Sequence, residues 1–182
     1  MAEIRIYPDP MLLKKTEQVR NIDGQVKEIV EHMIKVMYAN RGIGLAAPQI
    51  GIPSQIIVVS LETGWKALIN PELVAGEGGS VLEEGCLSLP GIEVAVKRKE
   101  RIFIRAWNPE GKEIDWEVSG LPSRVCQHEI DHLHGILIIN HVSRLKRKLL
   151  IRKMIKDRKR SQKKVSFFED SPEGVQGKGG GL

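Results

Sequence analysis

The sequence feature that most constrains this chain is a histidine-rich segment at residues 127–135, QHEIDHLHG. His128 and His132 stand four residues apart, and Glu129 follows the first of them. An α-helix advances about 100° per residue, so the two imidazoles would lie about 40° apart on one face. The pattern therefore predicts a zinc-hydrolase helix that supplies two metal ligands and a general base. The alternative is a solvated helix that carries two of the chain's 5 histidines by chance.

A catalytic metal needs a third protein ligand beside the two imidazoles. The metzincin pattern would place it at position 138, which is Ile138, and His141 comes three residues too late. A later glutamate is also excluded, because beyond the second histidine glutamate occurs only in the polar tail. The remaining candidate is Cys86 in the segment EGCLSLP, since thiolate binds zinc or ferrous iron strongly. On its own, a free cysteine is most often a small buried hydrophobe.

Three blocks of the sequence together resemble the peptide deformylase family. They are GIGLAAPQ at residues 42–49, EGCLS at residues 84–88 and QHEIDH at residues 127–132. Their order and separation match that family. The similarity extends from about residue 4 into the basic segment near residue 160, and the tail is not covered.

The resemblance implies an enzyme that removes the N-formyl group from the N-terminal formyl-methionine of newly made polypeptides and releases formate. It implies one divalent metal ion per chain, with Fe(II) expected in the cell and Zn or Ni also accepted by such donors. By resemblance, the metal ligands are Cys86, His128 and His132.

The resemblance also implies roles for three further residues. Glu129 would take a proton from water and later pass it to the leaving amine. The side-chain amide of Gln49 and the backbone N–H of Leu87 would stabilise the developing oxyanion. Independently of the resemblance, Asp131 is adjacent to the histidines in helical projection and is a candidate for an ion pair with Arg98 rather than for the metal, because histidine ligands need hydrogen-bond acceptors. The walls expected for the methionine pocket, taken partly from motif position, are Ile43, Gly44, Leu87, Leu121 and Val125.

Two further side chains near the motif blocks are expected to support the site without binding metal. Glu84 would support the strand that presents Cys86. Cys126 would lie about 200° around the central helix from His128, so we expect it to pack in the core.

Local patterns predict the order of the elements. Asp23 would cap a helix that runs to about residue 40 with apolar residues at three- and four-residue steps. The central helix would begin at residues 119–122 and end at Gly135. Strands are expected at residues 54–61, 67–70, 94–98, 101–107 and 112–118, with a further buried strand at residues 136–139. This order favours an α+β fold, with antiparallel strands packed around a central metal-binding helix and a basic helix at the C-terminus.

Length and composition predict a single domain, and the resemblance implies that it is the catalytic one. The 182 residues are enough for one substantial core, which we place at residues 1–165, followed by a disordered tail at residues 166–182. Two cysteines, one of them a predicted ligand, form no disulfide framework and favour a reducing compartment. The start of the chain has no signal-like apolar region, and no stretch is apolar enough to span a membrane. We therefore expect a cytoplasmic protein, although an organellar protein without its leader would look the same.

Positive charge is concentrated near the C-terminus. Residues 144–164 contain twelve Lys or Arg and one Asp, a net +11, so the rest of the chain carries −6 within a total of +5. Such a run is most often the solvated face of an amphipathic helix. The resemblance adds a contact with the ribosome, because the C-terminal helix of some deformylases docks near the peptide exit, and phosphates attract Lys and Arg.

Two other functions stay open on the residues alone. One is a different hydrolase, such as a peptidase, that uses the same cysteine and two histidines. The other is a non-catalytic module that binds the ribosome or RNA and contains a structural metal. The intact Glu129 argues against the second.

Overall fold

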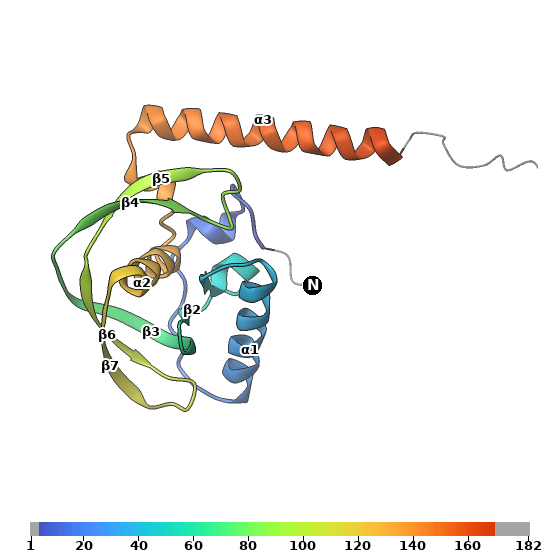
Figure 1. The fold of residues 1–182 in the computed structure, drawn as a ribbon. Helices are drawn as coiled ribbons and strands as arrows, with labels where there is room; N and C mark the ends of the chain where they lie inside the picture. The colour runs from blue at the N-terminus through green and yellow to red at the C-terminus, as the bar shows by residue number, and fades with distance from the viewer. Residues whose placement is uncertain (1–3, 170–182) are drawn as a thin grey trace, which may run out of the picture.

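The computed structural model describes residues 4–169, with side chains described to residue 160 (Figure 1). Short 3-10 helices (η) join the longer elements. In chain order the elements are η1 (Pro10–Leu13), α1 (Gly24–Ala39), β1 (Gly44–Ala46), η2 (Ala47–Ile50), β2 (Ile56–Leu61), β3 (Gly64–Glu77), β4 (Ser80–Gly85), β5 (Glu93–Arg98), β6 (Arg101–Trp107), β7 (Glu113–Ser119), α2 (Gly120–Leu133), η3 (Ile138–His141) and α3 (Arg144–Glu169).

The strands form two sheets on either side of helix α2. The larger sheet has the strand order β1-β2-β3-β6-β7, and β4 pairs with β5 in a separate two-stranded sheet. All pairings between these strands are antiparallel. Helix α2 lies between the two sheets in Figure 1. The predicted α+β fold, with antiparallel strands around a central helix, is confirmed.

One side of helix α2 is apolar and the other is polar. Its apolar side packs against the larger sheet, and Cys126 is fully buried there, as predicted. Each large side chain buried in this way contributes about 1.5–3 kcal/mol. The polar side, with His128, faces Glu84 on β4. Helix α2 therefore has the hydrophobic core on one side and the polar side chains around Glu84 on the other. Its apolar contacts are Val125, Cys126, Ile130 and Leu133.

Helix α1 covers the other face of β1 and β2, as its apolar spacing predicts. The Asp23 carboxylate accepts hydrogen bonds from the backbone N–H groups of Gln25 (3.0 Å) and Val26 (3.3 Å), which confirms the predicted cap. Its buried side chains are Val26, Val30, Met33, Val36 and Met37.

Strand β3 is longer than the predicted segment 67–70. Its first half pairs with β2 and its second half with β6, and register shifts separate the two regions. Asn70 lies between them with φ 50°, and its side-chain amide exchanges two 2.8 Å hydrogen bonds with the backbone of Val19. A strand shared between two partners depends on contacts that a local pattern does not contain.

A glycine is required just after α2 for two reasons. Gly135 has φ 70°, and its N–H donates to the carbonyl of His132 (3.1 Å). A Cβ at this position would also lie 2.8 Å from the backbone carbonyl carbon of Leu13. The backbone N–H of Thr16 donates to the carbonyl of Leu133 (2.9 Å), so the N-terminal segment covers this helix end.

The strand predicted at residues 136–139 is wrong. This segment instead leads into η3, and Leu137, Ile138 and Ile139 are buried. The Asn140 N–H donates to the carbonyl of Leu137 (2.7 Å), and its side-chain oxygen accepts from the Leu137 N–H (3.0 Å). These bonds close a tight turn. A short apolar run shows that a segment is buried, but it does not distinguish a strand from a helical turn.

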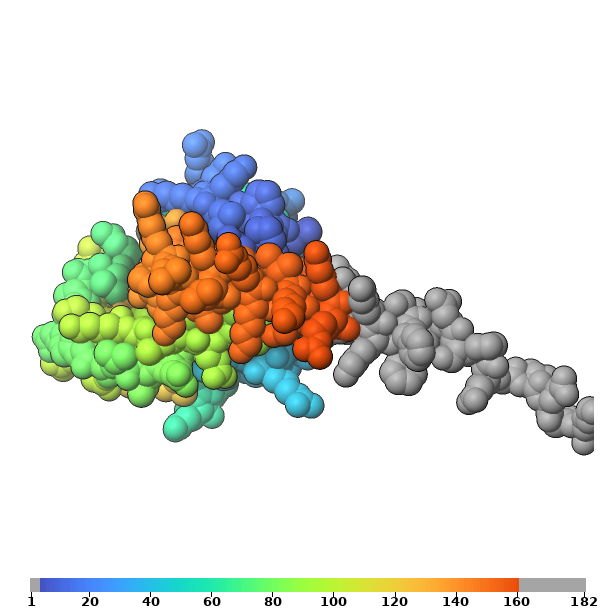
Figure 2. All heavy atoms as spheres, turned by 90° about the horizontal axis from the view of Figure 1, so that it is seen from above, coloured from blue at the N-terminus to red at the C-terminus, as the bar shows by residue number. Residues whose placement is uncertain are grey.

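Helix α3 crosses the surface between the N-terminal segment and the β4–β5 sheet (Figure 2). Met154 is buried, and Leu150 and Ile151 pack beside it on a cluster that includes Leu12 and Val96. The helix extends to Glu169, past the predicted end at residue 164, so residues 166–169 are helical. The rest of the predicted tail, residues 170–182, lies outside the described residues. Within the described part of the chain, no helix has the length and apolarity needed to cross a membrane.

Candidate active site

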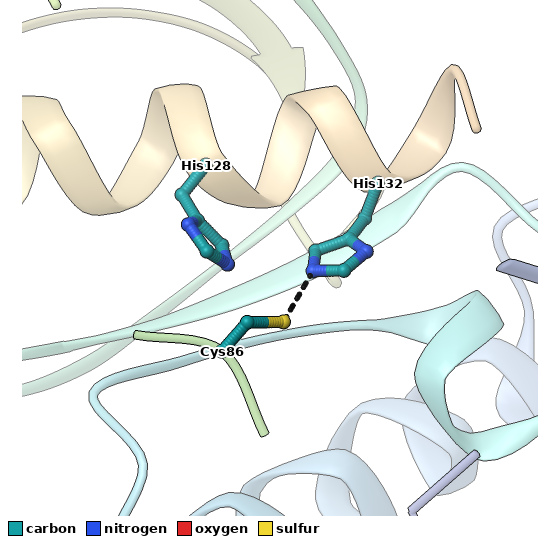
Figure 3. Close-up of side chains that lie close together, drawn as sticks. All are labelled: Cys86, His128 and His132. Carbon is teal, nitrogen blue, oxygen red and sulfur yellow. Dashed lines mark hydrogen bonds between the residues drawn. The ribbon is translucent and has the colours of Figure 1, made fainter. Parts of the chain in front are cut away.

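Cys86, His128 and His132 come together between β4 and α2. Cys86 follows the last residue of β4, and the two imidazoles project from α2 toward it (Figure 3). The Cys86 Sγ lies 3.3 Å from His132 Nε2, and the potential ligand atoms of all three residues lie within 4.8 Å of one another. Cys86, which lies 46 residues before His132 in the sequence, is thus brought to both histidines.

The loop after β4 turns sharply at Cys86. The Leu89 N–H donates to the Cys86 carbonyl (2.9 Å), which closes the turn. The Tyr7 N–H donates to the Ser88 carbonyl (3.0 Å), so the N-terminal segment holds the loop from outside. Within the described residues, the Leu87 N–H has no hydrogen-bond acceptor and is available to a ligand.

Glu84 stands behind His128. Its Oε2 lies 3.0 Å from His128 Nδ1, while Arg98 and Arg124 donate to the same carboxylate at 2.7–3.0 Å. Burial by itself raises the pKa of Glu84, but hydrogen bonds from His128 and both arginines lower it to about 2. The carboxylate is therefore charged, and His128 Nε2 is left facing Cys86. The sequence predicted only that Glu84 supports the strand, and its contact with His128 was not predicted.

The ion pair expected between Asp131 and Arg98 is present. Arg98 Nη1 lies 2.6 Å from Asp131 Oδ2, and His141 Nε2 lies 2.8 Å from the same oxygen. Arg98 therefore joins Asp131 on α2 to Glu84 on β4. Arg124 was missed as a partner of Glu84, although its place one helical turn before His128 puts it on the same side of α2.

The two histidines differ electrostatically. Burial lowers the pKa of His132 well below its ordinary value, and nearby His128 and Arg98 lower it further. Burial also acts to lower the pKa of His128, but its hydrogen bonds to Cys86 and Glu84 raise it well above the ordinary value. His132 Nδ1 is buried with no hydrogen-bond partner among the described residues. His132 is therefore neutral, the form in which histidine binds metals.

Glu129 lies beside the histidines but belongs to no ion pair among the described residues. Its side chain is buried, and its Oε2 has no hydrogen-bond partner there. Burial raises the pKa of Glu129 to about 7, and the nearby charges of Glu84 and Asp131 also act to raise it. A carboxyl group with this pKa exchanges protons readily near neutral pH.

The amide of Gln49 is held in one orientation. Its Oε1 accepts from the Ala46 N–H (2.8 Å), so its Nε2 turns toward Ser88 Oγ (3.2 Å) and Cys86 Sγ (3.8 Å). Ser88, which is fully buried, was not singled out by sequence analysis. The structure thus brings the Gln49 amide donor to the group of potential ligands.

A cavity of about 410 Å³ opens beside these groups and is large enough for a small ligand or a side chain. Ile43 and Leu121 lie at its rim, since 50% and 60% of their surfaces are exposed. Glu84 also lines the cavity, whereas Arg98 and Asp131 do not. All the residues predicted as pocket walls line it: Ile43, Gly44, Leu87, Leu121 and Val125.

This fold and site define a class of protein, the metal-dependent hydrolases that carry His-Glu-x-x-His on a helix. Comparison with known proteins identifies the family. The model of the polypeptide deformylase family matches residues 1–148. The peptide deformylase of Thermodesulfovibrio yellowstonii is 47% identical over 164 residues, which cover 87% of this chain and 99% of that protein. The peptide deformylase of Thermotoga maritima is 42% identical over 165 residues, which cover 90% of this chain and 100% of that protein.

Solved structures agree with this comparison. The crystal structure of a peptide deformylase from Legionella pneumophila has a TM-score of 0.84 and 34% identity, and covers 89% of this chain and 98% of its own. The chain belongs to the polypeptide deformylase family. It is an enzyme that removes the N-formyl group from the N-terminal formyl-methionine of newly made polypeptides and releases formate. The alternatives of a different metallohydrolase and of a non-catalytic module are not supported.

Proposed function

We propose that Cys86, His128 and His132 hold one divalent metal ion, and that Glu129, Gln49 and Leu87 carry out the deformylation. The observation that carries the proposal is the approach of a thiol and two imidazoles to within 4.8 Å beside a buried carboxylate. These residues would hold the ion with three protein ligands, the number that catalytic zinc sites use.

The donor atoms fit a metal ion. Metal–sulfur and metal–nitrogen bonds of about 2.3 Å and 2.0 Å at a tetrahedral angle separate the two atoms by about 3.5 Å. The 3.3 Å between Cys86 Sγ and His132 Nε2 is close to this value. One thiolate and two imidazoles accept Fe(II), Zn and Ni. We propose Fe(II) in the cell, on the family resemblance, and a reducing cytoplasm as the compartment, because a ligand thiol must stay reduced. Metal analysis of protein purified without oxygen tests the assignment.

Glu129 acts as the proton carrier. When bound, a divalent ion supplies Lewis-acid activation, which lowers the pKa of water from about 15.7 to about 7. Glu129, whose pKa is about 7, accepts the proton that water loses as its oxygen adds to the formyl carbon. It then donates that proton to the amine nitrogen as the C–N bond breaks. The products are formate and a free N-terminal amine.

Two N–H donors stabilise the negative charge that develops on the formyl oxygen. Gln49 Nε2 faces the site because the amide oxygen is held by the Ala46 N–H. The Leu87 N–H follows directly after Cys86 and has no acceptor among the described residues. Donors that are oriented before the reaction cost no reorganisation during it, and removing one of them lowers kcat about 100- to 1,000-fold.

The cavity walls bind the substrate. The apolar residues around the cavity accept the methionine side chain. The backbone of β1 can also contact the peptide. The carbonyl of Ile43, the residue before β1, accepts a hydrogen bond from the Ser60 N–H on β2 and therefore faces β2. N–H and C=O groups of successive strand residues point in opposite directions, so those of Gly44 point away from β2. A peptide laid along this edge would pair with Gly44 by β-augmentation.

The reaction is tested with formyl-methionyl peptide and the same peptide carrying a free amine. We expect formate release from the first and no cleavage of the second. Glu129→Gln should lower kcat/KM at least about 100-fold while one metal ion per chain is retained. Glu28→Gln, on the exposed side of α1, is the matched control. Full activity in the Glu129→Gln enzyme would overturn the assignment.

We also infer that α3 contacts ribosomal RNA. Met154 and its neighbours hold one side of the helix on the body, and basic residues occupy the exposed side. Phosphates attract such a surface, and each contact increases the salt dependence of binding. The exposed basic residues are Arg144, Lys146, Lys148, Arg152, Lys153, Lys156, Arg158, Lys159 and Arg160.

Cosedimentation with purified ribosomes tests this contact. The triple variant Arg152→Glu, Lys153→Glu and Lys156→Glu should lose binding and keep full activity on a short peptide. The control is Lys27→Glu on the exposed side of α1. Unchanged cosedimentation of the triple variant across salt concentrations would exclude the contact.

A further inference from the structure

Gly44 occupies a position where no side chain fits. A Cβ there would lie 2.4 Å from Glu129 Oε1, 3.0 Å from Glu129 Cδ and 2.6 Å from Val125 Cγ1. Gly44 is not among the glycines with positive φ, so its backbone conformation suits any residue. Glycine is therefore required here for space alone.

The strand that carries Gly44 has little room to retreat. Gly44 pairs with Val59 of β2, and the neighbouring Ile43 carbonyl accepts from Ser60 N–H (2.9 Å). The three residues of β1 are buried, and α2 packs directly against this strand. A methyl group at position 44 would therefore displace the Glu129 carboxylate and the Val125 side chain rather than the strand.

Hydrogen bonds do not orient this carboxylate. Among the described residues, Glu129 Oε2 is buried without a partner, and Oε1 has no donor either. Packing is then the main restraint on where the carboxylate lies, and the walls on this side are the Gly44 backbone and the Val125 side chain.

We propose that Gly44 is a positioning residue for deformylation. Because glycine has no Cβ, the Glu129 carboxylate can lie against β1. This packing sets the position from which Glu129 accepts the proton of the attacking water. This role differs from contact with the substrate backbone, which the proposed function assigns to the same residue. The inference rests on Glu129 being the proton carrier.

Kinetics of Gly44→Ala separate the two roles. Because a misplacement of about 1 Å can lower a rate about 100-fold, we expect kcat to fall by about that factor, with KM changed less than about threefold. Metal content should be unchanged. Gly24→Ala is the control, since a Cβ at the start of α1 meets nothing within 4 Å. An unchanged kcat with a raised KM would mean that Gly44 serves only substrate contact, and would overturn the inference.

Thermal unfolding of the metal-loaded protein gives a readout independent of activity. Gly44→Ala should lower the unfolding midpoint by about 5 °C, because overpacking destabilises a filled site. In the Glu129→Ala background the same change should cost less, because the contact with the Glu129 carboxylate is gone and only the contact with the Val125 side chain remains. Equal shifts in the two backgrounds would overturn this inference alone. Retained activity of Glu129→Gln would overturn the proposed function and this inference with it.

Discussion

Glu84 Oε2 lies 3.0 Å from His128 Nδ1, and this contact links helix α2 to the two-stranded sheet of β4 and β5. The same carboxylate accepts from Arg98 on β5 and Arg124 on α2. Two cations and an imidazole therefore meet one buried anion. This group orients the His128 ring and joins β4, β5 and α2 at the strand end that carries Cys86.

Replacing Glu84 tests this role. Glu84→Gln removes the charge that two buried arginines face, so we expect the free energy of unfolding to fall by about 3 kcal/mol. Metal affinity should fall about 10- to 100-fold, because the acceptor behind a histidine ligand is weakened. Urea unfolding and chelator competition measure the two effects. Glu83→Gln, on the exposed neighbour, should leave both unchanged, and equal metal affinity in the two variants would refute the role.

Asp131 and Asp115 allow a comparison between a partly buried carboxylate and an exposed one. Asp131→Asn weakens the contacts to Arg98 and His141, and the Asp131 side chain is only 22% exposed. We expect a loss of about 1–3 kcal/mol in unfolding free energy and faster metal loss to a chelator. Asp115→Asn removes an ion pair with Arg105. Because the Asp115 side chain is 76% exposed, this change should cost less than about 1 kcal/mol. Matching metal-loss rates in the two variants would count against Asp131.

The two thiols should differ in reactivity. Cys86 is half-buried in the site, whereas Cys126 is fully buried and its burial raises the pKa of its thiol to about 12. A thiol reagent at pH 8 should therefore modify Cys86 alone in metal-free folded protein, and neither cysteine once metal is bound. Unfolding should expose both. Rapid modification of Cys86 in the metal-loaded enzyme would contradict its role as a ligand.

Alanine substitutions at two glycines with positive φ distinguish the cost of backbone strain from the cost of steric clash. Gly111→Ala has open space around its Cβ and φ 74°, so it should cost about 1–2 kcal/mol from backbone strain alone. Gly135→Ala has a similar φ of 70° but meets the Leu13 backbone at 2.8–2.9 Å, which should add about 1–3 kcal/mol. Urea unfolding of both variants measures the difference, and equal costs would show that the N-terminal segment yields easily.

Local patterns in the sequence were enough to predict the helices and most strands. The apolar spacing of α1, the Asp23 cap and Gly135 after α2 each act over a few residues, so each could be interpreted without tertiary contacts. His128, Glu129 and His132 stand within one and a half helical turns, which made their common side predictable. The resemblance then added Gln49 and Leu87, which no spacing rule would have joined to them.

Contacts between distant segments were decided only by the tertiary structure. The sequence did not indicate that Glu84 supports His128, that Arg124 pairs with Glu84, or that residues 138–141 form a helical turn. The same holds for the space that Gly44 leaves for Glu129. A local pattern determines which side of a helix or strand is apolar, because neighbouring residues share one backbone geometry. Which side chains meet across the site depends on how sheets and helices pack, and packing involves the whole chain at once.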